Sequence, residues 1–178
     1  AVGADAGLSL TTGVQNTLIG SMSGDALTVG GDNIGIGRTS ITSDTKGSRT
    51  IAIGTGTLQN QNFTSATETN NIAIGYLAQS ANTTGIDNIA IGNGALDANT
   101  TGKEIVAIGV DACTAQNLTN SGSPEITCVG FEAGKSITSG GAFTLIGHKA
   151  GKSLTDAVGV VIVGSGSGPD LTGSDNTF

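Results

Sequence analysis

The stretch Asn71-Ile-Ala-Ile-Gly75 recurs without change as Asn88-Ile-Ala-Ile-Gly92, 17 residues further along the chain. When the last glycine is taken as an anchor, the pattern extends over ten repeats whose spacing is 17 residues, or 21 in two cases. The anchors are Gly3, Gly20, Gly37, Gly54, Gly75, Gly92, Gly109, Gly130, Gly147 and Gly164. The two longer spacings contain insertions near Phe63 and Leu118. A fixed period of this length is typical of a solenoid in which each repeat forms one coil.

The residue immediately before each anchor predicts a β-strand, because all ten are Ile or Val. The position two residues earlier is mostly Ile, Val or Thr, and alternate residues of a strand point to the same face. We therefore predict an all-β chain whose β-branched column faces the coil interior. This structural core would comprise Ile19, Ile36, Ile53, Ile74, Ile91, Ile108, Val129, Ile146 and Val163.

The opposite face of the predicted strand also lacks strongly polar side chains, since it reads mostly Ala, Leu, Cys or Ile. A strand that is apolar on both faces is covered on both, here by the same chain or by another copy. The apolar second face predicts that the chain associates with itself, so that burial between copies adds to the burial within each coil.

Other columns predict turns and ladders within each coil. The residue three positions after the anchor is always Ala, Ser or Thr, as expected where backbones pass closely, and a second short strand is expected to follow it. Further on, Gln61, Asn82, Asn99 and Gln116 share a column and are predicted to form stacked amide ladders. The next column is mostly Thr, and Thr followed two residues later by Gly is typical of a turn.

Composition and charge exclude several classes of protein. The 178 residues include 30 glycines, no tryptophan and a net charge of −7, with no cluster of Lys or Arg to neutralise phosphates. We therefore expect no nucleic-acid binding, and because no run of about 18 apolar residues occurs, we expect no insertion into a membrane. Residues 1–178 are predicted to form a single repetitive domain. Because the first and last repeats begin and end in mid-strand, the chain is interpreted as a fragment of a longer fibrous protein.

The two cysteines leave two interpretations open. Cys113 and Cys128 do not have the spacing of a zinc site, and both fall in columns of small or apolar residues. They are either buried free thiols or the partners of a disulfide between successive coils.

Candidate catalytic and metal-binding residues are few, and we expect neither enzymatic activity nor a cofactor. His148 is the one histidine and occupies a turn column. Ala133-Gly-Lys-Ser136 and Ala150-Gly-Lys-Ser153 resemble half of a phosphate-binding loop but lack its first glycine, so we interpret them as turns with a solvated lysine. An acidic column is interpreted as a solvated strand entry, with a bound cation as the alternative; its members are Asp32, Asp87, Glu104 and Glu125.

The residue immediately after the anchor is the predicted contact point for a receptor, if this segment makes contacts at all. Arg38, Tyr76, Phe131 and His148 share that column, and the two insertions are further candidates. A plain spacer is the alternative role.

Repeats that read Asn-Ile-Ala-Ile-Gly-x-x-Ala, joined by Asn-Thr-Thr-Gly loops, resemble the YadA-like head repeats of trimeric autotransporter adhesins and related repeats in phage tail fibres. The match is carried by residues 71–78, 82–95 and 99–112. The period of 17 residues is longer than the usual repeat of that family. The resemblance implies a left-handed parallel β-roll, here of about ten coils, that assembles as a homotrimer. It further implies a structural or adhesive segment of a phage tail fibre or, alternatively, of a bacterial adhesin head. Its place would then be the virion or the cell surface, and its partner a host glycan or protein.

Two other functions are weighed against the fibre. The Thr column raises the hypothesis of a monomeric ice-binding solenoid, although Thr is not paired across a flat face. A polysaccharide-cleaving solenoid would need paired carboxylates in different environments, and the acidic column shows no such difference. The interior assignment of the Ile/Val column predicts that Ile91→Asp prevents assembly, whereas Arg38→Ala leaves folding intact.

Overall fold

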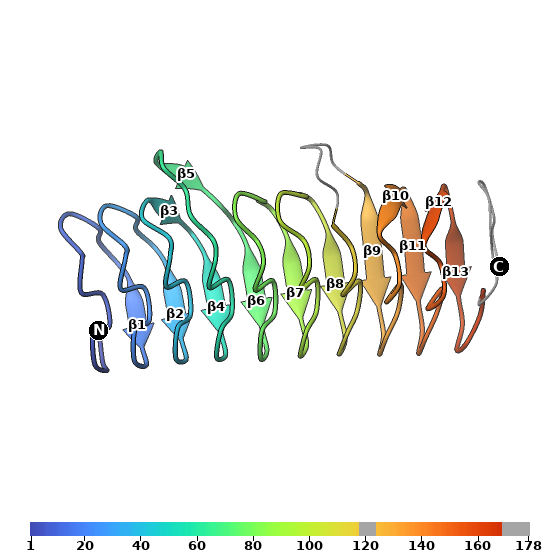
Figure 1. The fold of residues 1–178 in the computed structure, drawn as a ribbon, viewed down its shortest axis with the longest axis horizontal. Coiled ribbons are helices and arrows are strands. Elements are labelled where there is room, and N and C mark those ends of the chain that lie inside the picture. The colour runs from blue at the N-terminus through green and yellow to red at the C-terminus, as the bar shows by residue number, and fades with distance from the viewer. Residues whose placement is uncertain (118–123, 169–178) are drawn as a thin grey trace.

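The chain is a parallel β-solenoid of about eight turns, with about 17 residues per turn (Figure 1). This computed structural model describes residues 1–117 and 124–168, except the side chain of Ala157. The main sheet has nine strands: β1 (Thr17–Ile19), β2 (Ile34–Ile36), β4 (Ile51–Ile53), β6 (Ile72–Ile74), β7 (Ile89–Ile91), β8 (Val106–Ile108), β9 (Ile126–Val129), β11 (Phe143–Ile146) and β13 (Val161–Val163). Two small parallel sheets pair β3 (Gly47–Ser48) with β5 (Thr67–Glu68), and β10 (Ser139–Gly141) with β12 (Asp156–Val158). The described residues form no helix.

The number of turns is lower than the ten coils expected from the anchors. The first repeat contributes only an isolated bridge between Val2 and Ile19, and the last repeat runs into residues 169–178, which lie outside the described residues. The prediction of a second strand after the small-residue column is also wrong, because the segments that follow this column form turns. The short additional strands lie instead just before the main strands.

The predicted register is confirmed in the main sheet. Ile72 pairs with Ile89 and Ile74 with Ile91, so equivalent residues of successive coils lie side by side. The anchor Gly75 has φ +136°, and a Cβ placed on it would lie 2.5 Å from the carbonyl oxygen of Gly92. Only glycine fits where the turns stack this closely.

The interior assignment of the Ile/Val column is wrong. The residue between the two β-branched positions is the buried one, as in Ala73 and Ala90, which are fully buried. The predicted core column instead points outward and is half-buried or exposed, with Ile19 42% and Val163 58% exposed. Alternation separates the two faces of a strand but does not say which is interior when both are apolar. The small interior of a 17-residue coil determines which face is interior, because in most coils the inward position of the strand has room only for Ala or Gly.

Two facing columns fill the coil interior with complementary volumes. The strand contributes Leu18, Gly35, Ala52, Ala73, Ala90, Ala107, Cys128, Leu145 and Ile162. Four residues after each anchor, the turn contributes Gly24, Ile41, Leu58, Gln79, Leu96, Cys113, Gly134 and Gly151. A large residue in one column accompanies a small one in the other: a Cβ on Gly24 would lie 2.8 Å from Cδ2 of Leu18, and a Cβ on Gly35 3.2 Å from Cδ1 of Ile41.

A buried disulfide joins Cys113, in the turn after β8, to Cys128 in β9. The structure therefore favours the second interpretation of the cysteines, a bond between successive coils. The bond lies in the interior, where the large residue changes from the turn column to the strand column.

Candidate interaction surfaces

The outward side of the main sheet is a continuous apolar surface, which we call the outer sheet face. It consists of the first and last positions of the three-residue strands and the equivalent positions elsewhere, two for each of nine strands, and none of the eighteen is charged. Fifteen are Ile or Val; the other three are Thr17, Thr127 and Thr144. At a strand spacing of about 4.8 Å, nine strands extend this surface over roughly 38 Å.

The outer sheet face differs from an ordinary exposed surface. All its side chains are half-buried or exposed, because each is shielded only by the equivalent residues of neighbouring coils. Scattered apolar residues are normal on a protein surface, but a contiguous stripe of this length marks an interaction site. A β-sheet face made only of Ile, Val and Thr can pack against another flat apolar surface.

The predicted receptor-contact column lies along one edge of the solenoid, in the turns that follow the main strands. Its four named residues are all exposed, as expected for that column. Phe131 and His148 stack with ring centroids 5.3 Å apart and planes 11° apart. Arg38 and Tyr76 follow β2 and β6, in coils that are not adjacent to each other or to this pair. The structure therefore brings together two of the four predicted residues.

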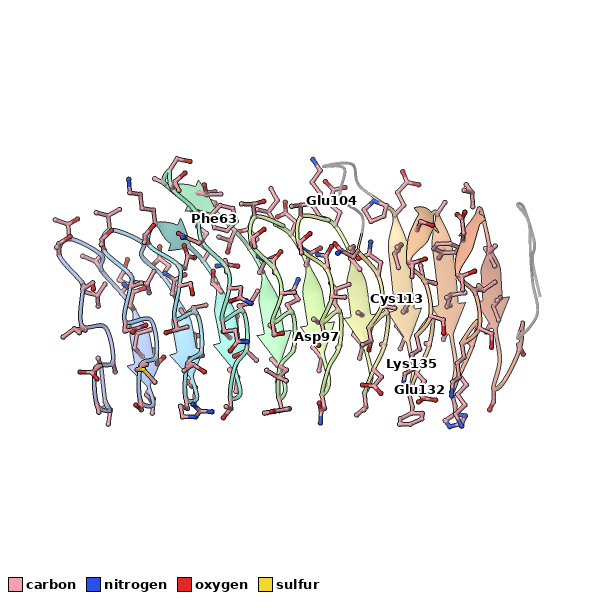
Figure 2. All side chains as sticks on the ribbon, viewed as in Figure 1. Phe63, Asp97, Glu104, Cys113, Glu132 and Lys135 are labelled. Atoms are coloured by element: carbon pink, nitrogen blue, oxygen red, sulfur yellow. A yellow bond between two sulfur atoms is a disulfide. The ribbon has the colours of Figure 1, made fainter. Side chains whose placement is uncertain are left out.

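An ion network lies beside this aromatic pair. The Glu132 carboxylate contacts Lys135 Nζ at 2.8 Å and Lys152 Nζ at 2.6 Å, and Lys135 also contacts Asp111 Oδ2 at 2.8 Å. Hydrogen bonds from Lys135 and Lys152 lower the pKa of the Glu132 carboxyl to about 2. The pKa of Lys135 is raised, first by its hydrogen bond to Asp111 and next by that to Glu132. Figure 2 shows Glu132 and Lys135 together at one edge, with Phe63 and Glu104 at the other.

The Gly-Lys-Ser segments acquire a role here that their sequence did not suggest. Lys135 and Lys152 belong to turns, as predicted, but their ammonium groups hold Glu132 rather than being simply solvated. Lys149 lies over the Phe131 ring, with Nζ 5.8 Å from the centroid. The missed signal is the recurrence of Lys at the same column in two successive coils, with Glu132 three residues before the first.

The acidic column does not gather into a metal site. Asp32, Asp87, Glu104 and Glu125 are exposed, and Asp87 accepts a hydrogen bond from Asn70 Nδ2 at 2.9 Å. In residues 1–117 and 124–168, no group of three or more His, Cys, Asp or Glu side chains has the arrangement needed to hold a metal ion.

Phe63 anchors the first insertion to the interior and is therefore removed from the candidate contacts, whereas Thr64 and Ser65 after it are exposed. Phe63 is only 7% exposed, and its N–H donates to the buried Asp44 carboxylate at 3.1 Å. Asp44 also accepts from Gly47 N–H at 3.0 Å and from Gln61 Nε2 at 2.7 Å. The second insertion, near Leu118, lies outside the described residues.

The hydroxyl groups of the Thr column form hydrogen bonds between successive coils. Thr28 Oγ1 donates to the carbonyl of Thr45 at 2.9 Å, and Thr83 Oγ1 donates to that of Thr100 at the same distance. Hydroxyl protons used in this way are not free for an ice lattice, so the geometry disfavours the ice-binding hypothesis.

Comparisons with protein-family models, curated proteins and solved structures gave no match for this chain. In the part of the chain that the structure describes, no helix is long and apolar enough to cross a membrane.

Proposed function

We propose that this chain is a structural segment of a homotrimeric fibre, built as a left-handed parallel β-roll and carried on a phage tail or a bacterial surface. One observation supports self-association above all: the outer sheet face, apolar and uncharged, is left uncovered by residues 1–117 and 124–168 of its own chain. Three copies, the left hand and the fibre setting come from the resemblance of the repeats.

Another copy of this chain suits the outer sheet face as a partner. Every strand presents the same side-chain types at the same register, so two copies can align over the whole length of the sheet. The net charge of −7 disfavours close contact elsewhere, but the outer sheet face contributes none of that charge. Burial of its Ile and Val side chains, at about 25 cal/mol per Å² of apolar area, favours this association.

The proposal is tested by measuring mass with light scattering at micromolar chain concentration. We expect three times the chain mass of 17.3 kDa. A stable monomer under these conditions contradicts the proposal.

Two adjacent residues separate assembly from folding. Ile91→Asp places a charge on the outer sheet face, and we expect a folded monomer with the circular dichroism of the parent. Ala90→Asp places the same charge in the interior, where Ala90 is fully buried, and we expect loss of the fold because an unpaired buried charge is very unfavourable. A trimer that survives Ile91→Asp contradicts the assigned interface. The sequence-based expectation that Ile91→Asp prevents assembly is kept, but its reason changes, because Ile91 lies on the outer sheet face and not in the interior.

A further inference from the structure

We propose that the turn edge formed by residues 131–135 and 148–152 is a binding site for an acidic saccharide. The inference takes its biological setting from the proposed fibre function, to which it adds a ligand class. Four side chains carry it: the stacked rings of Phe131 and His148, and the ammonium groups of Lys149 and Lys152.

Charge distinguishes this edge from the same edge in the other coils. In the sequence, the five residues after the anchor Gly147 include Lys149, Lys152 and His148 but no acid, for a net charge of +2 with His neutral. The five residues after each of the other nine anchors carry between −1 and +1. Among the ten turns that follow an anchor, this is therefore the one where an anion meets the least repulsion.

One of the two ammonium groups is held in place before any ligand arrives. Glu132, whose side chain is 11% exposed, fixes Lys152 Nζ at 2.6 Å, yet the Lys152 side chain is 41% exposed. Lys149 forms no ion pair with the described residues, and its Nζ lies 5.8 Å from the centroid of the Phe131 ring. An incoming carboxylate or sulfate therefore finds one unpaired and one partly paired ammonium, and Lys152 has little side-chain entropy left to lose.

The aromatic pair indicates that the ligand is more than a small anion. Phe131 is 43% exposed, and the neighbouring Val110 in the preceding coil is 41% exposed, so an apolar strip continues beside the lysines. A sugar ring has an apolar C–H surface that packs on such a strip, and an acidic sugar also carries the charge that the lysines bind. A neutral sugar lacks the second feature and a free inorganic anion lacks the first.

Isothermal titration calorimetry with two acidic probes tests the proposal. Tetragalacturonate presents carboxylates and a heparin tetrasaccharide presents sulfates as well, while maltotetraose is the neutral control. We expect at least one acidic probe to bind, more weakly as salt is raised, and maltotetraose not to bind. Failure of both acidic probes at millimolar concentration, or equal binding of maltotetraose or of inorganic sulfate, would overturn the proposal.

Variants locate the binding on the turn edge. We expect Lys149→Ala combined with Lys152→Ala, and separately Phe131→Ala, to weaken binding at least tenfold. Arg38→Ala and Tyr76→Ala change exposed residues of the same column in distant coils and are expected to bind as the parent does. Lys149→Ala alone leaves the Glu132 ion pairs intact, so a loss of binding in this variant does not reflect disruption of the network. Unchanged affinity in the double-lysine variant contradicts the site.

The two proposals can fail separately. The mass of each sample is measured alongside its titration. A monomer that binds the acidic probe contradicts only the trimeric fibre, and a trimer that fails to bind contradicts only the saccharide site.

Discussion

The coils that contain β4 to β8 and those that contain β9 to β13 have nearly the same period but fill their interiors in opposite ways. In the central coils, a small strand residue such as Ala90 accompanies a large turn residue such as Leu96. In the C-terminal coils, a large strand residue such as Leu145 accompanies Gly151. A large residue can therefore occupy either of the two facing columns when the other column holds a small residue, and neither position requires one residue type by itself.

The same two regions also differ in how their coils are linked. In two of the central coils, those of β6 and β7, a buried asparagine before the strand bonds to the next coil: Asn88 Oδ1 accepts from the N–H of Ile105 at 3.1 Å, and Nδ2 donates to the carbonyl of Gly102 at 2.9 Å. From Ile105 onward this column is apolar, with Ile126, Phe143 and Val160. The disulfide and the Glu132 network instead link the C-terminal coils to one another and to the coil of β8.

The largest effect is expected from reversing the interior pattern in a C-terminal coil. Gly151→Leu places a side chain where a Cβ already lies 3.1 Å from Leu145 Cδ1, and we expect a loss of about 3 kcal/mol or more in the free energy of unfolding. Leu145→Ala alone is expected to cost about 2–5 kcal/mol through the cavity it leaves. Both can be measured by chemical denaturation.

The double variant Leu145→Ala with Gly151→Leu recreates the central pattern. Leu96 occupies the same turn position at φ +53°, so the backbone of this column accommodates leucine. We expect the double variant to be less destabilised than the sum of the single changes. Strict additivity would contradict the complementary filling of the two columns.

The second effect concerns the junction between the two regions. The disulfide closes a sequence separation of 15 residues, and its removal is expected to cost about 3 kcal/mol. Adding a reductant should therefore lower the unfolding midpoint of the parent. The variant with Cys113→Ala and Cys128→Ala should not respond to reductant; an equal response in both proteins would contradict the bond.

The smallest effect is a pH dependence confined to the C-terminal region. Because Lys135 and Lys152 lower the pKa of the Glu132 carboxyl to about 2, its contribution is complete above the ordinary pKa of about 4.5 and is lost as pH falls through 2. We expect the parent to unfold at a higher temperature than Glu132→Gln near neutral pH, and the difference to shrink as the pH falls from 4.5 to 2. A difference that stays constant over this range contradicts the assignment.

Much of the fold could be predicted because each main feature of the repeat follows from one residue type that recurs at a fixed position. The anchor glycines and the strands ahead of them follow from local rules, and the pairing of Ile74 with Ile91 follows from the spacing. The amide column was predicted only in part. Asn82 Nδ2 donates to Gln61 Oε1 of the preceding coil at 3.5 Å, but Asn82 and Asn99 also close their own turns, with Gly85 N–H and Gly102 N–H each donating to the Oδ1 at 3.0 Å. The ladder between coils lies in the asparagine column before the strand.

For the candidate contact residues too, some properties could be predicted from the sequence and others depend on the tertiary structure. Exposure of Phe131 and His148 could be expected from a variable turn column, whereas their stacking and the ion network beside them depend on three coils being in register. Burial of Phe63 depends on Asp44, which lies 19 residues earlier in the chain.

By itself, the sequence determined the period, the parallel strands and the positions where only glycine fits, because these depend on residues at a fixed spacing along one chain. Only the tertiary structure decided which apolar side of the strand is interior. That choice depends on the space enclosed by a 17-residue coil, which Ala90 and Leu96 fill together, leaving Ile89 and Ile91 outside. The volume inside a coil depends on how the strand column and the turn column face each other in space. The alternation of residues along the strand alone does not give this volume.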